Sequence, residues 1–92
     1  MDPRIRKAVL EKIEASISST AELNNILERL ESVRVSNKDD FAFGIAIGRV
    51  YNSFHYQTRR TLKRNATEAE FREFLEILSQ NVDAIKTRLQ RQ

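Results

Sequence analysis

The sequence predicts an all-α protein, a small four-helix bundle, and three observations carry that prediction. The 92-residue chain contains only two Gly and one Pro, whereas sheet proteins use both residues in their many turns. Apolar residues recur at intervals of three and four over four segments, which is the spacing of one face of an α-helix. The connections between these segments are short, which favours antiparallel neighbours in an up-and-down order.

Length and composition limit the remaining possibilities. A chain of 92 residues is expected to form one helical domain over residues 1–92. The apolar fraction of 40% and the charged fraction of 32% exclude a disordered chain and a membrane-spanning one. A domain of this size buries only about 60–65% of the surface that its unfolded chain exposes, so self-association would enlarge a modest core.

The first two helices are expected near Pro3–Ser18 and after Ser19. Asp2 can cap the first helix, and Pro3 stands where its missing N–H costs nothing. A capping box over residues 19–22 opens the second helix. The apolar positions of the first helix are Ile5, Val9, Leu10, Ile13 and Ile17, and those of the second are Leu23, Ile26, Leu27, Leu30 and Val33.

The third helix is predicted from about Phe41 to Arg64, after a loop over residues 36–40. Asp39 or Asp40 can cap its start, and Asn65 tolerates the left-handed conformation that often ends a helix. Large and small residues alternate over residues 41–48, as they would in a strand. A helix is favoured because no other segment supplies a partner strand. The helical stripe also continues through Phe43, Ile47, Val50 and Phe54.

The fourth helix has the clearest pattern in the chain. A second capping box, Thr67 to Glu70, opens it, and glutamates dominate its first turns while Lys86, Arg88 and Arg91 lie near its end, as the helix dipole favours. Its predicted apolar stripe consists of Phe71, Leu75, Leu78, Val82, Ile85 and Leu89, with Phe74 beside it.

The beginning of the third helix is apolar on every side, and such a helix must be surrounded. Gly44 and Gly48 lie one turn apart, and each costs about 1 kcal/mol in a helix relative to Ala. Close approach of another helix would offset that cost, so Phe41, Gly44, Ile45 and Gly48 are the predicted helix-packing and self-association residues. The alternative is a tight contact within one chain, and both can hold together.

The second part of the third helix carries a basic face. Residues 41–67 contain five of the 16 Lys and Arg residues and none of the 13 Asp and Glu residues. Such a face can bind the phosphate backbone of a nucleic acid, with an aromatic ring to stack on a base. The alternative is a solvated face whose arginines pair with glutamates of the second and fourth helices. The candidate nucleic-acid or anion contacts are Arg49, Tyr56, Arg59, Arg60, Lys63 and Arg64.

The side chains needed for catalysis are scarce. The chain has no Cys and a single histidine, His55, which we expect to be packed near the buried side of the third helix. No Gly-rich loop could cradle a phosphate, and no Glu precedes His55 by three residues as in di-metal helical bundles. We therefore expect a protein without enzymatic activity, cofactor, metal or small-molecule substrate.

These observations give two functional hypotheses. The first is a non-enzymatic interaction module that forms a homodimer and presents helix faces to a protein partner. The alternative is a nucleic-acid-binding protein that uses the basic face. The amino-terminal residues open no apolar signal region, and the longest apolar run has eight residues, against about 20 for a spanning helix, so a cytoplasmic protein without membrane contact is expected.

Overall fold

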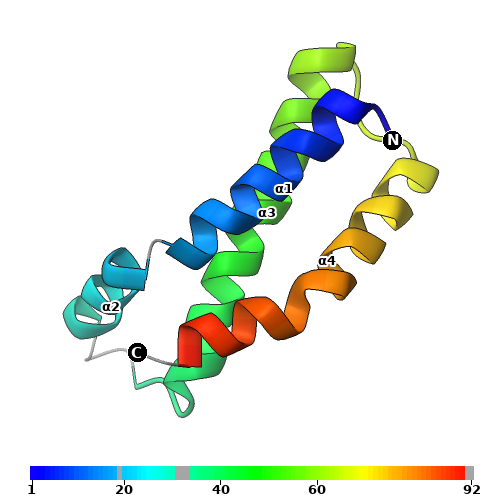
Figure 1. The fold of residues 1–92 in the computed structure, drawn as a ribbon. Coiled ribbons are helices and arrows are strands. Elements are labelled where there is room, and N and C mark those ends of the chain that lie inside the picture. The colour runs from blue at the N-terminus through cyan, green and yellow to red at the C-terminus, as the bar shows by residue number, and fades with distance from the viewer. Residues whose placement is uncertain (19, 31–33, 91–92) are drawn as a thin grey trace.

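The computed structural model describes residues 1–18, 20–30 and 34–90, and its secondary structure is all-helical (Figure 1). The helices are α1 (Pro3–Ser18), α2 (Thr20–Arg29), α3 (Lys38–Leu62) and α4 (Glu68–Gln90). No strand occurs in these described ranges, and residues 41–48 are helical. The all-α prediction is therefore confirmed, and helix rather than strand is correct for the alternating segment.

The three long helices pack against one another, and the short α2 packs chiefly against α3. Figure 1 shows α1 running antiparallel to α3, so that α1 begins at the end of the molecule where α3 ends. Helix α4 runs in the direction of α1, since the Met1 ammonium pairs with Glu73, 2.6 Å away, near the start of α4. The radius of gyration is 14.2 Å, with extents of 40 × 23 × 20 Å. A compact chain of this length would measure about 12 Å, so the molecule is elongated.

Helix α1 has the predicted bounds and cap. The Asp2 carboxylate accepts a hydrogen bond of 2.8 Å from the backbone N–H of Arg4. The Arg4 guanidinium also donates to it, and this contact chiefly lowers the pKa of Asp2 to about 2. The predicted stripe is buried except at Leu10, which is 40% exposed; the buried members are Ile5, Val9, Ile13 and Ile17.

Helix α2 is shorter than its apolar pattern suggests. It ends at Arg29, Leu23 is its buried anchor, and Leu30 is 43% exposed just beyond it. Ser19 of the predicted capping box and Val33 of the predicted stripe lie outside the described residues. Because α2 has only 10 residues, it covers only part of the neighbouring helix α3.

The predicted ends of α3 need correction. It begins at Lys38, and Asn37 is its N-cap, with the side-chain Oδ1 of Asn37 accepting from the Asp40 N–H at 3.0 Å. Asp39 and Asp40 therefore lie in the first turn, where their charge complements the helix dipole without capping it. At the other end, Lys63 adopts the left-handed conformation that was expected at Asn65, with φ of 60°.

The buried face of α3 is a single row with a spacing of four, which runs Ala42, Ala46, Val50, Phe54, Thr58. It faces the row of α1, which has the same spacing, so ridges of the same kind meet. The Thr58 hydroxyl is buried and donates to the Phe54 carbonyl oxygen at 2.8 Å. Phe43 and Ile47, predicted to be on the buried side, are only half-buried at the flank of this row.

The predicted capping box of α4 is confirmed. The Glu70 N–H donates to the Thr67 hydroxyl at 3.1 Å, and the Thr67 N–H donates to the Glu70 carboxylate at 2.8 Å. The predicted stripe is rotated: Phe74 is fully buried, whereas Leu75 is 45% exposed. Phe74 stacks on Phe54 with ring centroids 4.4 Å apart, because the larger apolar surface of the ring gains more from burial. Arg91, predicted in the last turn, lies outside the described residues.

Candidate nucleic-acid interface

Gly44 and Gly48 lie on an open face of α3. A Cβ atom placed on either residue would have no atom of the described residues within 4 Å, and both residues are exposed. The interpretation of these glycines as a tight contact within the chain is therefore wrong. The small residues on the buried row of α3 are Ala42 and Ala46 instead. Contact of this face with a second subunit stays a prediction.

The surroundings of the glycines are only partly covered. Phe41 and Ile45, the other two predicted packing residues, are half-buried, and Ile45 packs against the core. On another side the Lys86 ammonium lies 5.0 Å from the centroid of the Phe43 ring, a cation–π contact. The described helices thus cover the first turns of α3 only in part, as the apolar pattern led us to expect, and cover of the remaining surface by a second subunit stays a prediction.

Two arginines of the predicted basic face have carboxylate partners. Arg64 makes a bidentate contact with Glu70, with hydrogen bonds of 2.8 and 3.1 Å. These bonds, together with the Thr67 N–H, lower the pKa of Glu70 to about 2. The hydrogen bonds to Glu70 also raise the pKa of Arg64. Arg49 donates to Glu22 of α2 at 3.2 Å. For these two residues the alternative of pairing with glutamates of the second and fourth helices is correct.

The other cations of that face are exposed and form no ion pair among the described residues. These are Arg59, Arg60 and Lys63. Tyr56, one turn before Arg60, is 51% exposed. All four lie at the carboxyl-terminal end of α3, where the backbone carbonyls of the helix end add a partial negative charge beside the cations. We use the term basic strip for Tyr56, Arg59, Arg60 and Lys63.

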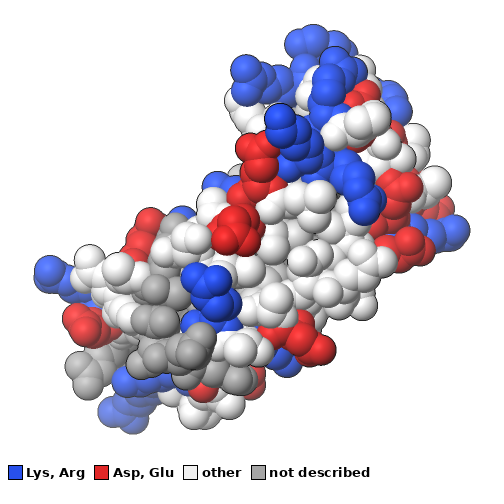
Figure 2. Space-filling view, viewed as in Figure 1, with Lys and Arg blue, Asp and Glu red and all other residues white. Residues whose placement is uncertain are grey.

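The antiparallel packing of α1 and α3 concentrates positive charge at one end of the molecule. Figure 2 shows Lys and Arg side chains gathered at the end where α1 begins and α3 ends. Helix α1 contributes Arg4, Arg6 and Lys7 there, but Arg4 pairs with Asp2 and Lys7 lies 3.9 Å from Glu11. Arg6 is exposed and has no ion-pair partner in the described part of the chain.

A groove between α1 and α3 adds a residue that sequence reasoning missed. Its volume is about 320 Å³, and Lys12 of α1 lines it together with residues of α3 from Arg49 to Gln57. Lys12 stands one residue from the buried Ile13, at the flank of the apolar stripe of α1. The apolar pattern of α1 locates its buried face, but no signal in the sequence says which flank of that face adjoins the basic face of α3.

His55 belongs to an aromatic cluster at the contact between α3 and α4. It is half-buried, and its ring centroid lies 4.7 Å from Tyr51, 5.0 Å from Phe54 and 5.8 Å from Phe71. The prediction of a packed histidine is confirmed. The cluster joins the second half of α3 to the first turns of α4.

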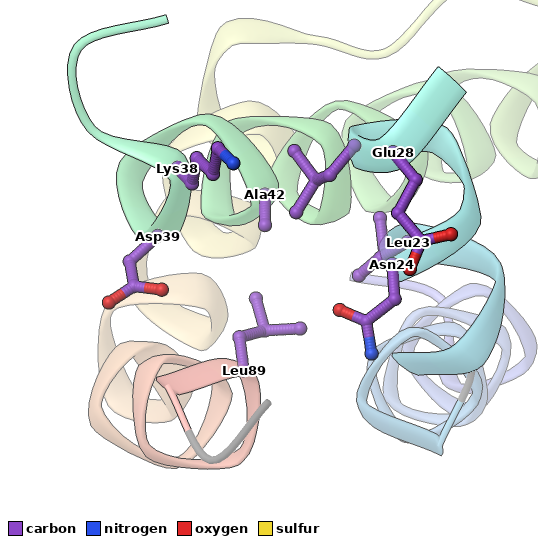
Figure 3. Close-up of a pocket in the computed structure, with 8 residues that line it drawn as sticks. Leu23, Asn24, Glu28, Lys38, Asp39, Ala42 and Leu89 are labelled. Carbon is purple, nitrogen blue, oxygen red and sulfur yellow. The ribbon is translucent and has the colours of Figure 1, made fainter. Parts of the chain in front are cut away.

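A cavity of about 510 Å³ lies between α2, the start of α3 and the end of α4. Figure 3 shows Leu23, Ala42 and Leu89 pointing toward its centre, whereas the carboxylates of Asp39 and Glu28 lie at opposite sides. In the ranges that the structure describes, no three Asp, Glu, His or Cys side chains are grouped so that they could hold a metal ion.

Comparison of the chain with models of protein families, with curated proteins and with solved structures finds no match. Over the described residues, no helix combines the length and the apolar character that crossing a bilayer requires. The candidate site therefore rests on its own geometry, which consists of the basic strip and the adjoining groove.

Proposed function

We propose that the protein is a non-enzymatic binding module that binds nucleic acid through the basic strip. One observation carries the proposal: Arg59, Arg60 and Lys63 are exposed at one end of α3 and have no carboxylate partner among the described residues. Exposed cations in folded proteins are usually interspersed with carboxylates, so a cluster of unpaired ones creates a positive potential that attracts polyanions. The whole segment 41–67 also lacks Asp and Glu.

The chemistry of the strip suits a phosphate backbone. The two arginines can each donate two parallel hydrogen bonds to phosphate oxygens, and the exposed Tyr56 ring offers a stacking surface for a base. The strip carries no arrangement of side chains that would read base edges in a groove, so binding would be mainly electrostatic and weakly selective for sequence. Such binding weakens steeply as the salt concentration rises.

The test is a fluorescence anisotropy titration with labelled single-stranded RNA, single-stranded DNA and duplex DNA at about 50 and about 200 mM salt. The affinity should fall by an order of magnitude or more from the lower to the higher salt concentration. Arg59→Gln/Arg60→Gln removes two phosphate contacts, so the slope of log K against log salt should fall by about 1.4 on single strands.

The matched control is Arg29→Gln/Lys38→Gln. It removes the same charge at the opposite end of the molecule, at the end of α2 and the start of α3. It should leave the affinity within about twofold of the original protein, because the two sites are separated by more than a Debye length of about 8–10 Å. Absence of binding at low salt would reject the proposal, and equal losses in both double variants would show that only net charge matters.

The second candidate is self-association through α3, with the four helices in an up-and-down order and the assembled face offered to a protein partner. The observation that favours it is the open space over Gly44 and Gly48 beside the half-buried Phe41 and Ile45. A helix of a second copy could approach the backbone there and cover apolar surface that α2 leaves exposed.

Light scattering and sedimentation at micromolar concentrations test this candidate. A dimer should form, and Gly44→Leu should shift it to monomer because the added side chain occupies the space that the second helix needs. Ser18→Leu is the control, since Ser18 is an exposed residue at the end of α1. A protein that stays monomeric would remove the candidate without affecting the basic strip.

A further inference from the structure

The groove between α1 and α3 has a lining that differs from the rest of the surface. It is formed by Lys12, Arg49, Asn52, Ser53, Tyr56 and Gln57. Two of these side chains are cations, the other four can donate hydrogen bonds, and none is a carboxylate. A volume of about 320 Å³ lies at the lower end of the range found for small-molecule sites. The groove therefore matches a compact anion better than an apolar ligand.

Arg49 is held in a way that leaves hydrogen-bonding capacity unused. Its Nη2 atom donates to Glu22 at 3.2 Å, whereas Nη1 is buried and donates to no group of the described protein. Buried guanidinium donors are normally satisfied, since an unmade hydrogen bond to a charged group is costly. Glu22 itself is 61% exposed, and so exposed an ion pair contributes little. The pair therefore competes only weakly for Arg49 and leaves most of its positive charge effective in the groove.

We propose that this groove is a site for a single phosphate group, carried either by a nucleotide or by the backbone of a bound strand. Arg49 supplies a guanidinium that would turn from the exposed Glu22 carboxylate to the phosphate oxygens that its fork fits. Lys12 supplies a second positive charge from the facing helix. Tyr56 lines the groove and is also a member of the basic strip. Its ring would stack on the base or sugar attached to that phosphate.

This inference deepens the proposed function, because it assigns one phosphate of the bound strand to the groove and the following phosphates to Arg59, Arg60 and Lys63. The groove and the strip meet at Tyr56, which lies one turn after Asn52 and one turn before Arg60. A small ligand with one phosphate would occupy the groove alone, whereas an oligonucleotide would use both. This difference allows the two proposals to be tested separately.

The experiment follows backbone amide signals of Ser53 and Tyr56 by NMR while the full chain is titrated with inorganic phosphate, adenosine monophosphate or a short oligonucleotide. Lys12→Gln and Arg49→Gln should each lower the affinity for adenosine monophosphate at least about tenfold, which is the usual loss when a hydrogen bond to a charged group is removed. Arg59→Gln is the matched control. It should leave the affinity for adenosine monophosphate unchanged and lower the affinity for the oligonucleotide. Lys12→Gln keeps the test valid if Arg49→Gln unfolds the chain.

A further variant separates binding from a purely structural role of Arg49. Glu22→Gln removes the carboxylate that competes for the guanidinium, so adenosine monophosphate should bind at least about twofold more tightly. If Arg49 only joins α2 to α3, Glu22→Gln would leave the affinity unchanged or lower it. Tyr56→Leu should lower the affinity for adenosine monophosphate and leave the affinity for inorganic phosphate unchanged, since only the nucleotide has a base to stack.

The outcomes distinguish the failure of the groove from the failure of the strip. If adenosine monophosphate and phosphate do not shift the Ser53 and Tyr56 signals, and the oligonucleotide depends on Arg59 but not on Lys12, the groove inference is overturned and the proposed function stands. If no probe binds at low salt, both fail. Weakening of adenosine monophosphate by Lys12→Gln but not by Arg59→Gln supports the groove.

Discussion

The two halves of α3 contribute to the same buried row but present different surfaces outside it. The amino-terminal half, residues 38–48, buries Ala42 and Ala46 and leaves its two glycines open to solvent. The carboxyl-terminal half, residues 49–62, buries Val50, Phe54 and Thr58 and carries exposed cations on its outer face. One continuous helix thus has a first half with small buried side chains and partial cover, and a second half with larger buried side chains and closer packing.

The difference shows that the neighbouring helices, and not the hydrophobicity of a segment, decide how much of it is buried. The second half of α3 lies against α1 and against the aromatic residues that begin α4, and Phe54 stacks on Phe74. The first half is more apolar, yet among the described residues its flanks lie beside the short α2 and the last turns of α4, which leave Phe41, Phe43 and Ile45 only half-buried. We therefore expect stability to be concentrated in the second half, beside the basic strip.

The largest expected effect comes from breaking the packed half. Phe54→Ala removes a fully buried ring together with its stacking on Phe74, and should lower the free energy of unfolding by about 3–5 kcal/mol. Urea denaturation followed by circular dichroism measures it. The matched variant Phe41→Ala, in the half-buried region of the first half, should cost less than half as much. Equal losses for the two variants would contradict the proposed concentration of stability.

The same contrast explains how much of the fold the sequence could predict. Caps depend on local hydrogen bonds, so Asp2 and the pair Thr67 and Glu70 were identified correctly. The row through Val50 and Phe54 was also predicted, because polar residues mark the opposite face of that half. Over residues 41–48 every face is apolar, so periodicity cannot select the buried one, and alanines rather than glycines occupy it.

The candidate site could be predicted only in part for a related reason. The absence of acidic residues over 41–67 marked the basic face, but ion pairs depend on which helix lies opposite. Arg64 pairs with Glu70, only six residues away, and Arg49 pairs with Glu22, 27 residues away. Lys12 joined the groove because α1 packs on that flank of α3. The ion pairs and the position of Lys12 both depend on how the helices pack, which the local sequence pattern does not determine.

A second prediction sharpens the contrast in the first half of α3. Gly44→Ala should raise the free energy of unfolding by about 0.8–1 kcal/mol, since Ala is the better helix former and the new methyl group meets nothing within 4 Å. Ala46→Gly, on the buried row of the same half, should instead lower it by at least a similar amount. Thermal and urea unfolding measure both. A destabilising Gly44→Ala would show that this face is covered by another surface.

The junction after the second half gives a pH-dependent effect of less than about 1 kcal/mol, the usual range for a carboxylate at a helix start. The folded pKa of Glu70 is lowered from 4.5 to about 2 by the hydrogen bonds from Arg64 and Thr67. A lowered pKa means that the carboxylate stabilises the fold above pH 4.5, and that this contribution is lost as the pH falls toward 2.

Urea unfolding of the original protein and of Glu70→Gln between pH 7 and pH 2 measures that contribution. Gln can still accept from the Thr67 N–H, so the variant removes mainly the charge that faces Arg64. The two proteins should differ at pH 7 and converge toward pH 2. A difference that stays constant over this interval would assign the effect to packing and not to the charge.

The smallest predicted change in stability, at Lys63, connects the packed half of α3 to its proposed function. Among the described residues, Lys63 is the one non-glycine residue with a positive φ. A side chain in this conformation costs about 1 kcal/mol. Its charge near the helix end returns part of that cost through the helix dipole. Lys63→Gly should therefore stabilise the protein by about 0.5 kcal/mol, measurable by urea unfolding, while it weakens oligonucleotide binding and lowers the salt slope by about 0.7. Lys63→Asn, which also tolerates this conformation, should behave in the same way. If Lys63→Gly stabilises the protein without weakening oligonucleotide binding, Lys63 does not belong to the basic strip. If the variant is more stable but binds more weakly, a cation occupies this position although glycine would give the more stable fold.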